Sequence, residues 1–223
     1  MKKELIELIA NSMPLLMQGA WMTIKVLACS MVMSFTLGLF FGMCICNRLK
    51  IRYLSLLIEG VFFVIRAIPF YVQLLIVYFV LPDLININLD SFAASILALG
   101  VCSSAYMAQL VRCGTDSIPI DQWETAQVLG YSTYDTVRTI ILPQMGRNVL
   151  PAITNEVESL LKSTSILASI GMLELTRMGQ NIISREMEPL AIYLTVALFY
   201  VCISFVINRI SKKVEARLRY AYN

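Results

Sequence analysis

The sequence predicts an all-α membrane protein with five transmembrane helices, and three observations support this fold class. Of the 223 residues, 58% are hydrophobic and only 15% are charged, which is more apolar surface than a soluble domain of this length could bury. The apolar residues gather in long runs, each near or above the roughly 20 residues that cross a bilayer as a helix. Polar stretches separate these runs. Together they predict a single transmembrane domain over residues 1–223.

The elements follow one another in a regular order. Residues 1–14 alternate Leu and Ile with Lys and Glu before Pro14, which predicts a short amphipathic helix at a membrane interface. The five predicted spans cover residues 15–46, 53–81, 91–111, 149–170 and 189–210. They are joined by a basic turn at 47–52, a loop at 82–90, a long polar segment at 112–148 and a loop at 171–188 with room for a short helix. The tail after residue 210 is basic and amphipathic.

A polar stretch at residues 121–143 lies between the third and fourth predicted spans. Asp121 followed three residues later by Glu124 is a capping-box pattern for a helix start. Gly130 is a natural left-handed stop for that helix. The pattern predicts a short helix that ends in a chain reversal.

A second short helix is predicted directly after the reversal. Ser132 with Asp135 is a helix-start signal, and Pro143 is expected to end the helix. Two short helices joined by an elbow, flanked by apolar spans, are typical of a loop that contacts another molecule.

The spacing within this loop follows a known pattern. The residues that fit it are Glu124, Ala126, Gly130, Ile140, Leu142 and Pro143, and Thr125 departs from it. The loop resembles the cytoplasmic EAA loop of ABC importer permeases, which reads Glu-Ala-Ala, three residues, Gly, nine residues, Ile, any residue, Leu-Pro. The resemblance implies that residues 121–143 form a coupling helix, with Glu124 supplying charge, Ala126 permitting close approach and Gly130 permitting the chain reversal.

Three further segments extend the resemblance across about residues 53–200. They are Arg66-Ala-Ile-Pro-Phe-Tyr-Val-Gln-Leu, Ala105-Tyr-Met-Ala-Gln-Leu-Val-Arg and Lys162-Ser-Thr-Ser-Ile. They are similar to segments of the polar amino acid permease family of histidine, glutamine and arginine type. The resemblance implies a five-helix, type I importer permease fold. Gln109 stands where that family has an acid, and Asp121 where it often has Gly.

The resemblance also assigns roles to individual residues. The predicted ATPase-coupling residues are Glu124, Thr125, Ala126, Gly130, Ile140, Leu142 and Pro143. The candidate substrate-path residues are Arg66, Pro69, Gln73, Gln109, Lys162, Thr164 and Ser165. For Arg66 and Gln73, a role in the path and a purely structural role both remain open.

Ionisable residues inside the spans are costly at bilayer depth and must be paired or hydrated. Glu59 and Arg66 lie two helical turns apart and share a face, while Glu156 and Glu158 lie in the fourth span. They fit either a polar path that meets the charged groups of an amino acid or internal ion pairs, such as one between Glu158 and Lys162.

Small residues in the spans fit a packing role. Gly38 and Gly42 form a Gly-x-x-x-Gly step suited to close helix packing. The six cysteines lie mostly in apolar runs, without the paired spacing of a metal site, so they are expected to be small apolar packers.

The charge distribution predicts an orientation. The loops on one side carry eleven Lys and Arg residues, and those on the other side carry four. The positive-inside rule therefore places the 121–143 loop and the C-terminus in the cytoplasm and the N-terminus outside. This predicts a multi-pass protein of the bacterial cytoplasmic (inner) membrane.

Several function classes are disfavoured. The chain has no Gly-x-x-x-x-Gly-Lys-Ser loop, so no ATPase site of its own is expected. It has no histidine and no intramembrane Asp pair, which disfavours an intramembrane enzyme, and it lacks the repeated halves of a secondary transporter. An ABC permease for another small solute, such as methionine or an osmolyte, remains the alternative.

The importer interpretation implies partners. Two ABC ATPase subunits would bind ATP and Mg²⁺, a second permease copy or homologue would complete the path, and an extracytoplasmic amino-acid-binding protein would deliver the substrate. Membrane lipid surrounds the subunit, nucleic acid is not an expected partner, and the chain itself is expected to bind no cofactor or metal.

Overall fold

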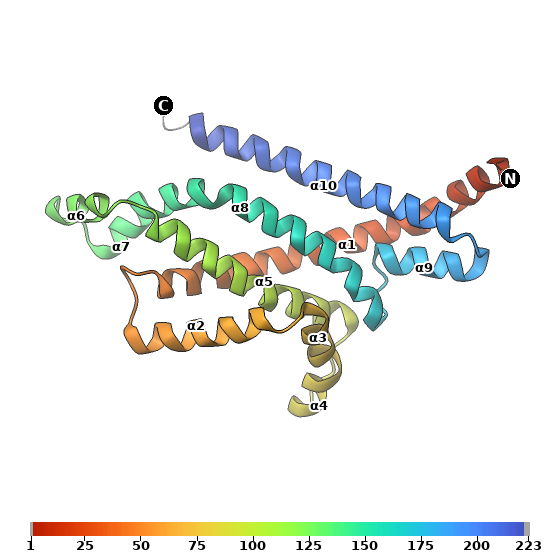
Figure 1. The fold of residues 1–223 in the computed structure, drawn as a ribbon, viewed down its shortest axis with the longest axis horizontal. Helices are drawn as coiled ribbons and strands as arrows, with labels where there is room; N and C mark the ends of the chain where they lie inside the picture. The colour runs from red at the N-terminus through yellow and green to blue at the C-terminus, as the bar shows by residue number, and fades with distance from the viewer. Residues whose placement is uncertain (1, 221–223) are drawn as a thin grey trace. The chain divides into compact units, whose positions relative to one another are not determined.

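The computed structural model describes the backbone of residues 2–220 and the side chains of residues 6–218. Within that range nearly every residue is helical and no strand is present, so the all-α prediction is confirmed (Figure 1). The two ends of the predicted 1–223 domain, including the last three residues of the basic tail, lie outside the described residues.

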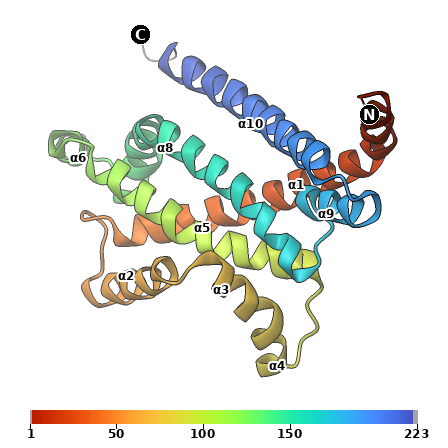
Figure 2. The same cartoon turned by 45° about the vertical axis from the view of Figure 1, so that its right-hand side comes forward.

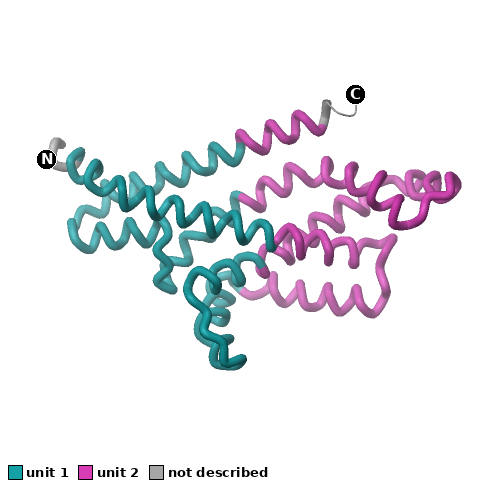
Figure 3. Tube along the Cα trace, turned by 180° about the vertical axis from the view of Figure 1, so that it is seen from behind, with its two compact units in different colours: residues 1–33, 69–100, 158–208 teal, residues 34–68, 101–157, 209–223 magenta. Residues whose placement is uncertain are grey.

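The chain forms two compact units, each built from three separate stretches (Figure 3). Unit 1 comprises Met1–Met33, Pro69–Gly100 and Glu158–Asn208, and unit 2 comprises Ser34–Ile68, Val101–Val157 and Arg209–Asn223. Each unit takes residues from the beginning, middle and end of the chain, so neither is a contiguous sequence domain. The assignment of a single permease domain stays a prediction.

The first helix, α1 (Lys2–Ile45), continues through Pro14, so the predicted division into an interfacial helix and a separate span is wrong. A proline inside a helix costs about 3 kcal/mol because it lacks an N–H and crowds the preceding turn. Packing on both sides of the proline opposes this cost. Ser12 and Leu16 are buried, and Leu16 lies in an apolar cluster with Leu175.

Gly38 and Gly42 let α1 pack closely on α5 (Ser91–Asp116), as their spacing predicted. A Cβ atom at position 38 would lie 2.5 Å from the side chain of Met107. A Cβ atom at position 42 would lie 2.7 Å from the carbonyl oxygen of Ala108. Both distances are too short for a Cβ atom and a non-bonded neighbour, so only glycine fits this helix crossing.

The predicted second span is not one helix. α2 (Arg52–Ala67) ends before two extended residues, Ile68 and Pro69, and α3 (Phe70–Leu75) follows. The proline ring disfavours helical backbone at the residue before it, which explains the break. A π-helical turn (Ile76–Val80) and α4 (Leu81–Ile85) then carry the chain to Asn86, which has a left-handed backbone. The span predicted for residues 53–81 is therefore interrupted at Ile68 and Pro69.

From residue 142 to residue 220 the chain forms two long helices with a 3₁₀ segment and a short helix between them. α8 (Leu142–Ser163) runs into a 3₁₀ segment, Thr164–Ile170, which ends at Gly171 with a left-handed backbone. α9 (Leu175–Glu186) is the short helix for which the 171–188 loop had room. α10 (Pro189–Tyr220) extends beyond the predicted end of the last span, so the described part of the basic tail is helical.

Three helical stretches among the described residues are long and apolar enough to cross a membrane, namely Ile6–Ile45, Ser91–Asp116 and Pro189–Leu218. The pieces on either side of the break at Ile68 and Pro69 would add a fourth if they form one span. α8 is not among these stretches, and it contains four charged residues, Arg147, Glu156, Glu158 and Lys162. The count of five spans stays a prediction.

Candidate functional site

The predicted coupling segment begins with α6 (Ile120–Val128), which starts directly after Pro119. The prediction that Asp121 caps this helix is therefore wrong. Pro119 has extended backbone (φ −54°, ψ 143°) and no side chain that could cap the helix. Its fixed φ favours an abrupt helix start, and Asp121 instead lies in the first turn, where the helix dipole favours a carboxylate.

α6 ends at Gly130, as predicted. Gly130 has φ +82°. Its N–H donates to the carbonyl of Gln127 at 3.0 Å, and the N–H of Tyr131 donates to the carbonyl of Ala126 at 3.0 Å. These two bonds form a Schellman motif, which satisfies carbonyls that the helix end would otherwise leave unpaired.

α7 (Thr133–Thr136) starts at Ser132, also as predicted. Ser132 Oγ accepts a hydrogen bond from the N–H of Asp135 at 3.1 Å and donates to its carboxylate at 2.6 Å. The prediction that Pro143 ends this helix is wrong, because a π-helical turn (Val137–Ile141) joins α7 directly to α8. A wide turn before the proline relieves the clash between its ring and the preceding turn.

Trp123 and Ala126 hold α6 against the body of unit 2. The two side chains share one face of the helix, with 7% and 1% of their surface exposed. Trp123 packs in an apolar cluster with residues that include Ile118, Ile141 and Met145. Trp123 was not predicted as a functional residue, although its spacing of three from Ala126 was a signal in the sequence.

Four of the seven predicted coupling residues line one groove of about 640 Å³. Its lining residues are Gln122, Thr125, Ala126, Leu129, Thr139, Ile140, Pro143, Gln144, Arg147 and Leu218. Of the other three predicted residues, Glu124 is exposed, Gly130 forms the turn, and Leu142 packs against the apolar cluster around Trp123. Figure 1 shows α6 and α7 at the ends of α5 and α8, and Figure 2 shows α6 at the end of α5.

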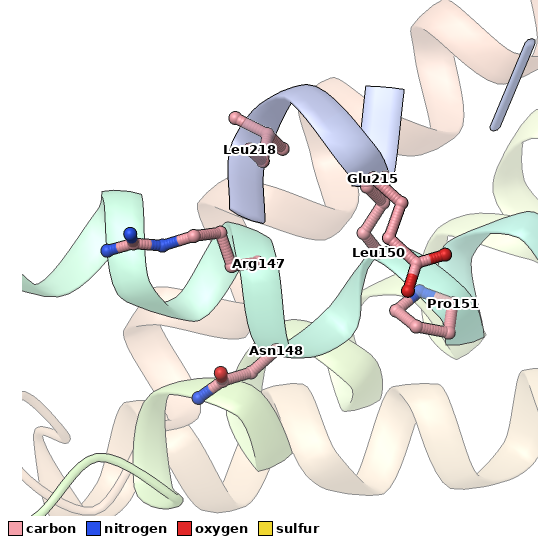
Figure 4. A pocket seen from close by; sticks show the side chains of 6 residues that line it. All are labelled: Arg147, Asn148, Leu150, Pro151, Glu215 and Leu218. Atoms are coloured by element: carbon pink, nitrogen blue, oxygen red, sulfur yellow. The ribbon is translucent and has the colours of Figure 1, made fainter. Parts of the chain in front are cut away.

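A second cavity of about 340 Å³ adjoins this groove between α8 and the end of α10 (Figure 4). Its lining residues are Arg147, Asn148, Leu150, Pro151, Glu215 and Leu218. Arg147 and Leu218 line both cavities, so the C-terminal end of α10 forms one wall of the groove. The sequence did not predict this role for α10.

The candidate substrate-path residues fall into both units. Arg66 and Gln109 belong to unit 2, and both are partly exposed. Unit 1 holds Pro69, Gln73, Lys162, Thr164 and Ser165. Within unit 1, α3 packs against the 3₁₀ segment, which brings the helix of Gln73 next to the segment that contains Thr164 and Ser165. Thr164 is buried there, and Lys162 is exposed.

The structure pairs Glu158 differently from the predicted ion pair with Lys162. Glu158 Oε1 accepts hydrogen bonds from Ser204 Oγ at 3.4 Å and from Asn208 Nδ2. Within residues 6–218, no ion pair joins Glu158 to Lys162, and that prediction is wrong. Partners on α10 hold the carboxylate, which the spacing along α8 could not reveal.

A chain of two buried serines holds Glu156. Ser103 Oγ donates to Glu156 Oε1 at 2.6 Å, and Ser34 Oγ donates to Ser103 Oγ at 2.9 Å. The three residues come from α5, α8 and α1 of unit 2. The chain fixes the orientation of an acid in α8, while part of the Glu156 side chain remains exposed.

Glu174 is a fully buried carboxylate that the sequence did not single out. It caps α9 by accepting hydrogen bonds from the N–H groups of Thr176 at 2.8 Å and Arg177 at 2.7 Å, and it accepts another from the Tyr200 hydroxyl at 3.0 Å. Burial raises the pKa of Glu174 above its usual value, and these hydrogen bonds oppose part of that rise.

This raised pKa predicts a pH-dependent stability. The folded state of unit 1 should be favoured most below the unfolded-state pKa of Glu, about 4.3, and should lose stability as the pH rises toward the higher folded-state pKa. Thermal unfolding of purified protein should be measured across this pH range. The melting temperature of Glu174→Gln should fall less with rising pH than that of the wild type. Glu188→Gln, at an exposed position, is the control. Parallel curves for the wild type and Glu174→Gln would contradict the prediction.

Comparison with known proteins confirms the predicted family and the importer permease fold. The profile of a family described as binding-protein-dependent transport system inner membrane component matches residues 34–220. The Escherichia coli (strain K12) glutamine transport system permease protein GlnP is 33% identical over 215 residues, which cover 93% of this chain and 94% of GlnP.

Two solved structures share the fold. A chain in the crystal structure of an amino acid ABC transporter with histidines superposes with a TM-score of 0.83 at 30% identity, covering 94% of this chain and 96% of that chain. A chain of the MetNI methionine ABC transporter, in an inward-facing conformation, superposes with a TM-score of 0.79 at 20% identity, over 92% and 97% of the two chains. The second likeness concerns the fold alone. The protein belongs to the family of binding-protein-dependent transport system inner membrane components.

Proposed function

We propose that this chain is the membrane-spanning permease subunit of an ATP-dependent importer of polar or basic amino acids, and that residues 120–143 couple it to a separate ATPase. The observation that carries the proposal is the groove beside α6. Thr125, Ala126, Ile140 and Pro143, which are separated by up to 18 positions in the sequence, line one groove. Motif residues gathered on one surface are suited to receive a partner.

Exposed apolar residues of α6 and α7 and of the turn between them support a docking role. Val128 is 86% exposed, Leu129 is 68% exposed and Tyr134 is 67% exposed, all within the polar loop between two long helices. Apolar side chains grouped on the surface of a polar segment indicate a protein contact. Trp123, in contrast, is buried and holds α6 firmly, so a force applied to the exposed face would reach the body of unit 2.

The proposed substrate class rests on the relatives and on the polar residues of the chain. GlnP is named as a glutamine permease, and the structure at 30% identity is an amino acid transporter. Within unit 1, Lys162 could meet the carboxylate of an amino acid. Gln73, Thr164 and Ser165 of the same unit would add hydrogen bonds, and Pro69 creates the helix break beside Gln73. In unit 2, Arg66 and Gln109 stay candidates for the path.

The proposal includes the remaining components of the importer. Two ATPase subunits would bind ATP and Mg²⁺, a second copy or homologue of this chain would complete the path, and an extracytoplasmic binding protein would deliver the substrate. The excess of Lys and Arg in the loops on one side supports a cytoplasmic coupling segment and C-terminus, with the N-terminus outside.

Reconstitution tests this proposal. The chain should be placed in liposomes with the ATPase and the binding protein encoded beside it, and uptake measured with a panel of labelled amino acids. We expect uptake of a polar or basic amino acid that depends on ATP and Mg²⁺. ATP-dependent uptake of methionine or an osmolyte alone would support the alternative substrate class, and uptake without the ATPase would contradict the proposed coupling.

Glu124→Lys tests the coupling surface in the same assay. It reverses the charge that α6 presents in its exposed first turns, so the ATPase should no longer co-purify and uptake should be lost. Glu188→Lys reverses an exposed charge on the loop after α9 and should behave like the wild type. Normal uptake by the Glu124→Lys variant would remove Glu124 from the coupling residues.

A further inference from the structure

A group of charged and polar residues, here called the Arg112 bracket, joins three parts of unit 2. Its members are Asn47, Lys50, Glu59, Arg112 and Asp116. Arg112 Nη1 donates to Glu59 Oε1 at 2.7 Å, and its Nε lies 3.8 Å from Asp116 Oδ2. Arg112 of α5 is thereby connected to α2 and to the last residue of its own helix.

Asp116 connects α5 to the turn between α1 and α2. Its Oδ1 accepts a hydrogen bond from the backbone N–H of Asn47 at 2.9 Å, and its Oδ2 accepts another from Asn47 Nδ2 at 2.7 Å. Lys50 Nζ donates to Asn47 Oδ1 at 2.9 Å. The turn and the end of α5 are therefore fixed to each other by two charge-assisted hydrogen bonds.

The bracket lies where the coupling segment leaves α5. Asp116 is the last residue of α5, and Pro119, which starts α6, follows three positions later. Between them, Ser117 Oγ donates to the carbonyl of Gly114 at 2.8 Å and accepts a hydrogen bond from Asn148 Nδ2 at 3.3 Å. The segment between Asp116 and α6 is therefore short and held by hydrogen bonds. A displacement of α6 would be passed to the Arg112 bracket with little loss.

The ion pair of the Arg112 bracket is weak, which favours a role in positioning the helices over a role in stabilising the fold. The side chains of Arg112 and Glu59 are 26% and 36% exposed, and an ion pair with that exposure contributes little to the stability of the fold. The apolar clusters around Trp123 and around Ile58 hold the same helices far more strongly. The planar guanidinium of Arg112, however, can contact Glu59 and Asp116 at the same time, which fixes the orientation of the side chain between them.

We propose that Arg112 is a positioning residue for coupling. It ties α2 and the α1–α2 turn to the end of α5, so that movement of α6 shifts these helices together. This rests on the coupling role of α6 proposed above. Without the bracket, the ATPase would still dock on the intact α6 surface and hydrolyse ATP, but less of the movement would reach α2, and fewer substrate molecules would be carried per ATP.

The test is a double-mutant cycle in the reconstituted importer. The variants are Glu59→Ala, Arg112→Ala and the double variant, with Arg185→Ala on α9 as the control for loss of an exposed arginine. The measurements are co-purification of the ATPase, ATP hydrolysis, and substrate carried per ATP. We expect normal co-purification and a fall of about twofold to fivefold in substrate per ATP, the range that loss of one partly exposed ion pair can produce.

The two single variants and the double variant should show a similar fall, because each removes the ion pair between Arg112 and Glu59, which is the connection to α2. Arg112→Lys, which keeps the charge but cannot contact two carboxylates in a fixed plane, should recover only part of the ratio. Arg185→Ala should match the wild type.

Two results would contradict the proposed positioning role of Arg112. One is a ratio of substrate to ATP in Arg112→Ala and Glu59→Ala that equals the wild-type ratio. The other is additive losses in the double variant, which would indicate independent structural effects. If the wild-type chain did not bind the ATPase at all, the proposed function itself would be contradicted. Failure of the Arg112 proposal and failure of the proposed function are therefore distinguishable.

Discussion

Gly130→Val is expected to abolish ATP-dependent uptake and co-purification of the ATPase while leaving membrane insertion intact. Gly130 has φ +82°, and no atom lies within 4 Å of the Cβ that a substitution would add, so the effect is backbone strain rather than a clash. Left-handed backbone costs an L-residue about 1–2 kcal/mol, and a β-branched side chain is a genuine outlier there. The Schellman turn would open, and α6 would no longer line one groove with the π-helical turn and α8.

Two further variants separate backbone strain from a general intolerance of substitution. Gly130→Asn should keep part of the activity, because Asn adopts left-handed backbone more readily than Val. Gly146→Ala adds a methyl group in α8, where nothing lies within 4 Å, and should behave like the wild type or be slightly more stable. Equal activity of Gly130→Val and the wild type would show that the left-handed turn is not needed for coupling.

Trp123→Ala is expected to have the second large effect. Trp123 is 7% exposed and anchors α6 in the cluster with Ile118, Ile141 and Met145. Truncating a buried aromatic side chain costs about 3–5 kcal/mol, which exceeds what a nine-residue helix can recover from its own hydrogen bonds. α6 should detach from unit 2, so that ATPase binding is weakened and uptake falls.

The other tryptophan of the chain provides a matched control. Trp21 is 59% exposed on α1, so Trp21→Ala should leave the resistance of residues 120–143 to proteolysis unchanged. Trp123→Ala should make this segment cleavable in purified protein, and Trp123→Phe should restore most of the protection, because it refills much of the site. Equal cleavage of Trp123→Ala and the wild type would contradict the anchoring role.

Local signals in the coupling segment were predicted well where the controlling atoms are neighbours in sequence. The Ser132 cap depends on Asp135, three residues away, and the Gly130 stop depends on backbone conformation at a single residue. The start of α6 was missed because two signals competed. Pro119 lies two residues before Asp121, and the helix starts after the proline rather than at the capping pattern.

The misplaced helix boundaries show how tertiary contacts overrule local signals. Pro14 and Pro143 were both expected to end helices, yet packing around Leu16 and a π-helical turn before Pro143 allow the chain to continue. At Pro69, where the residue before the proline adopts extended backbone, the helix does end. The same residue type therefore has three outcomes, and the surroundings decide among them.

The amino-acid order by itself determined the helical class, the long apolar runs, the family and the spacing of the coupling motif, because each depends on composition or on residues a few positions apart. The tertiary structure alone decided that Glu59 pairs with Arg112, that Glu158 accepts from Asn208, and that Trp123 is buried. Residues about 50 positions apart form those two polar contacts. Their energies depend on which side chains folding brings within bonding distance, and periodicity along one helix carries no information about that.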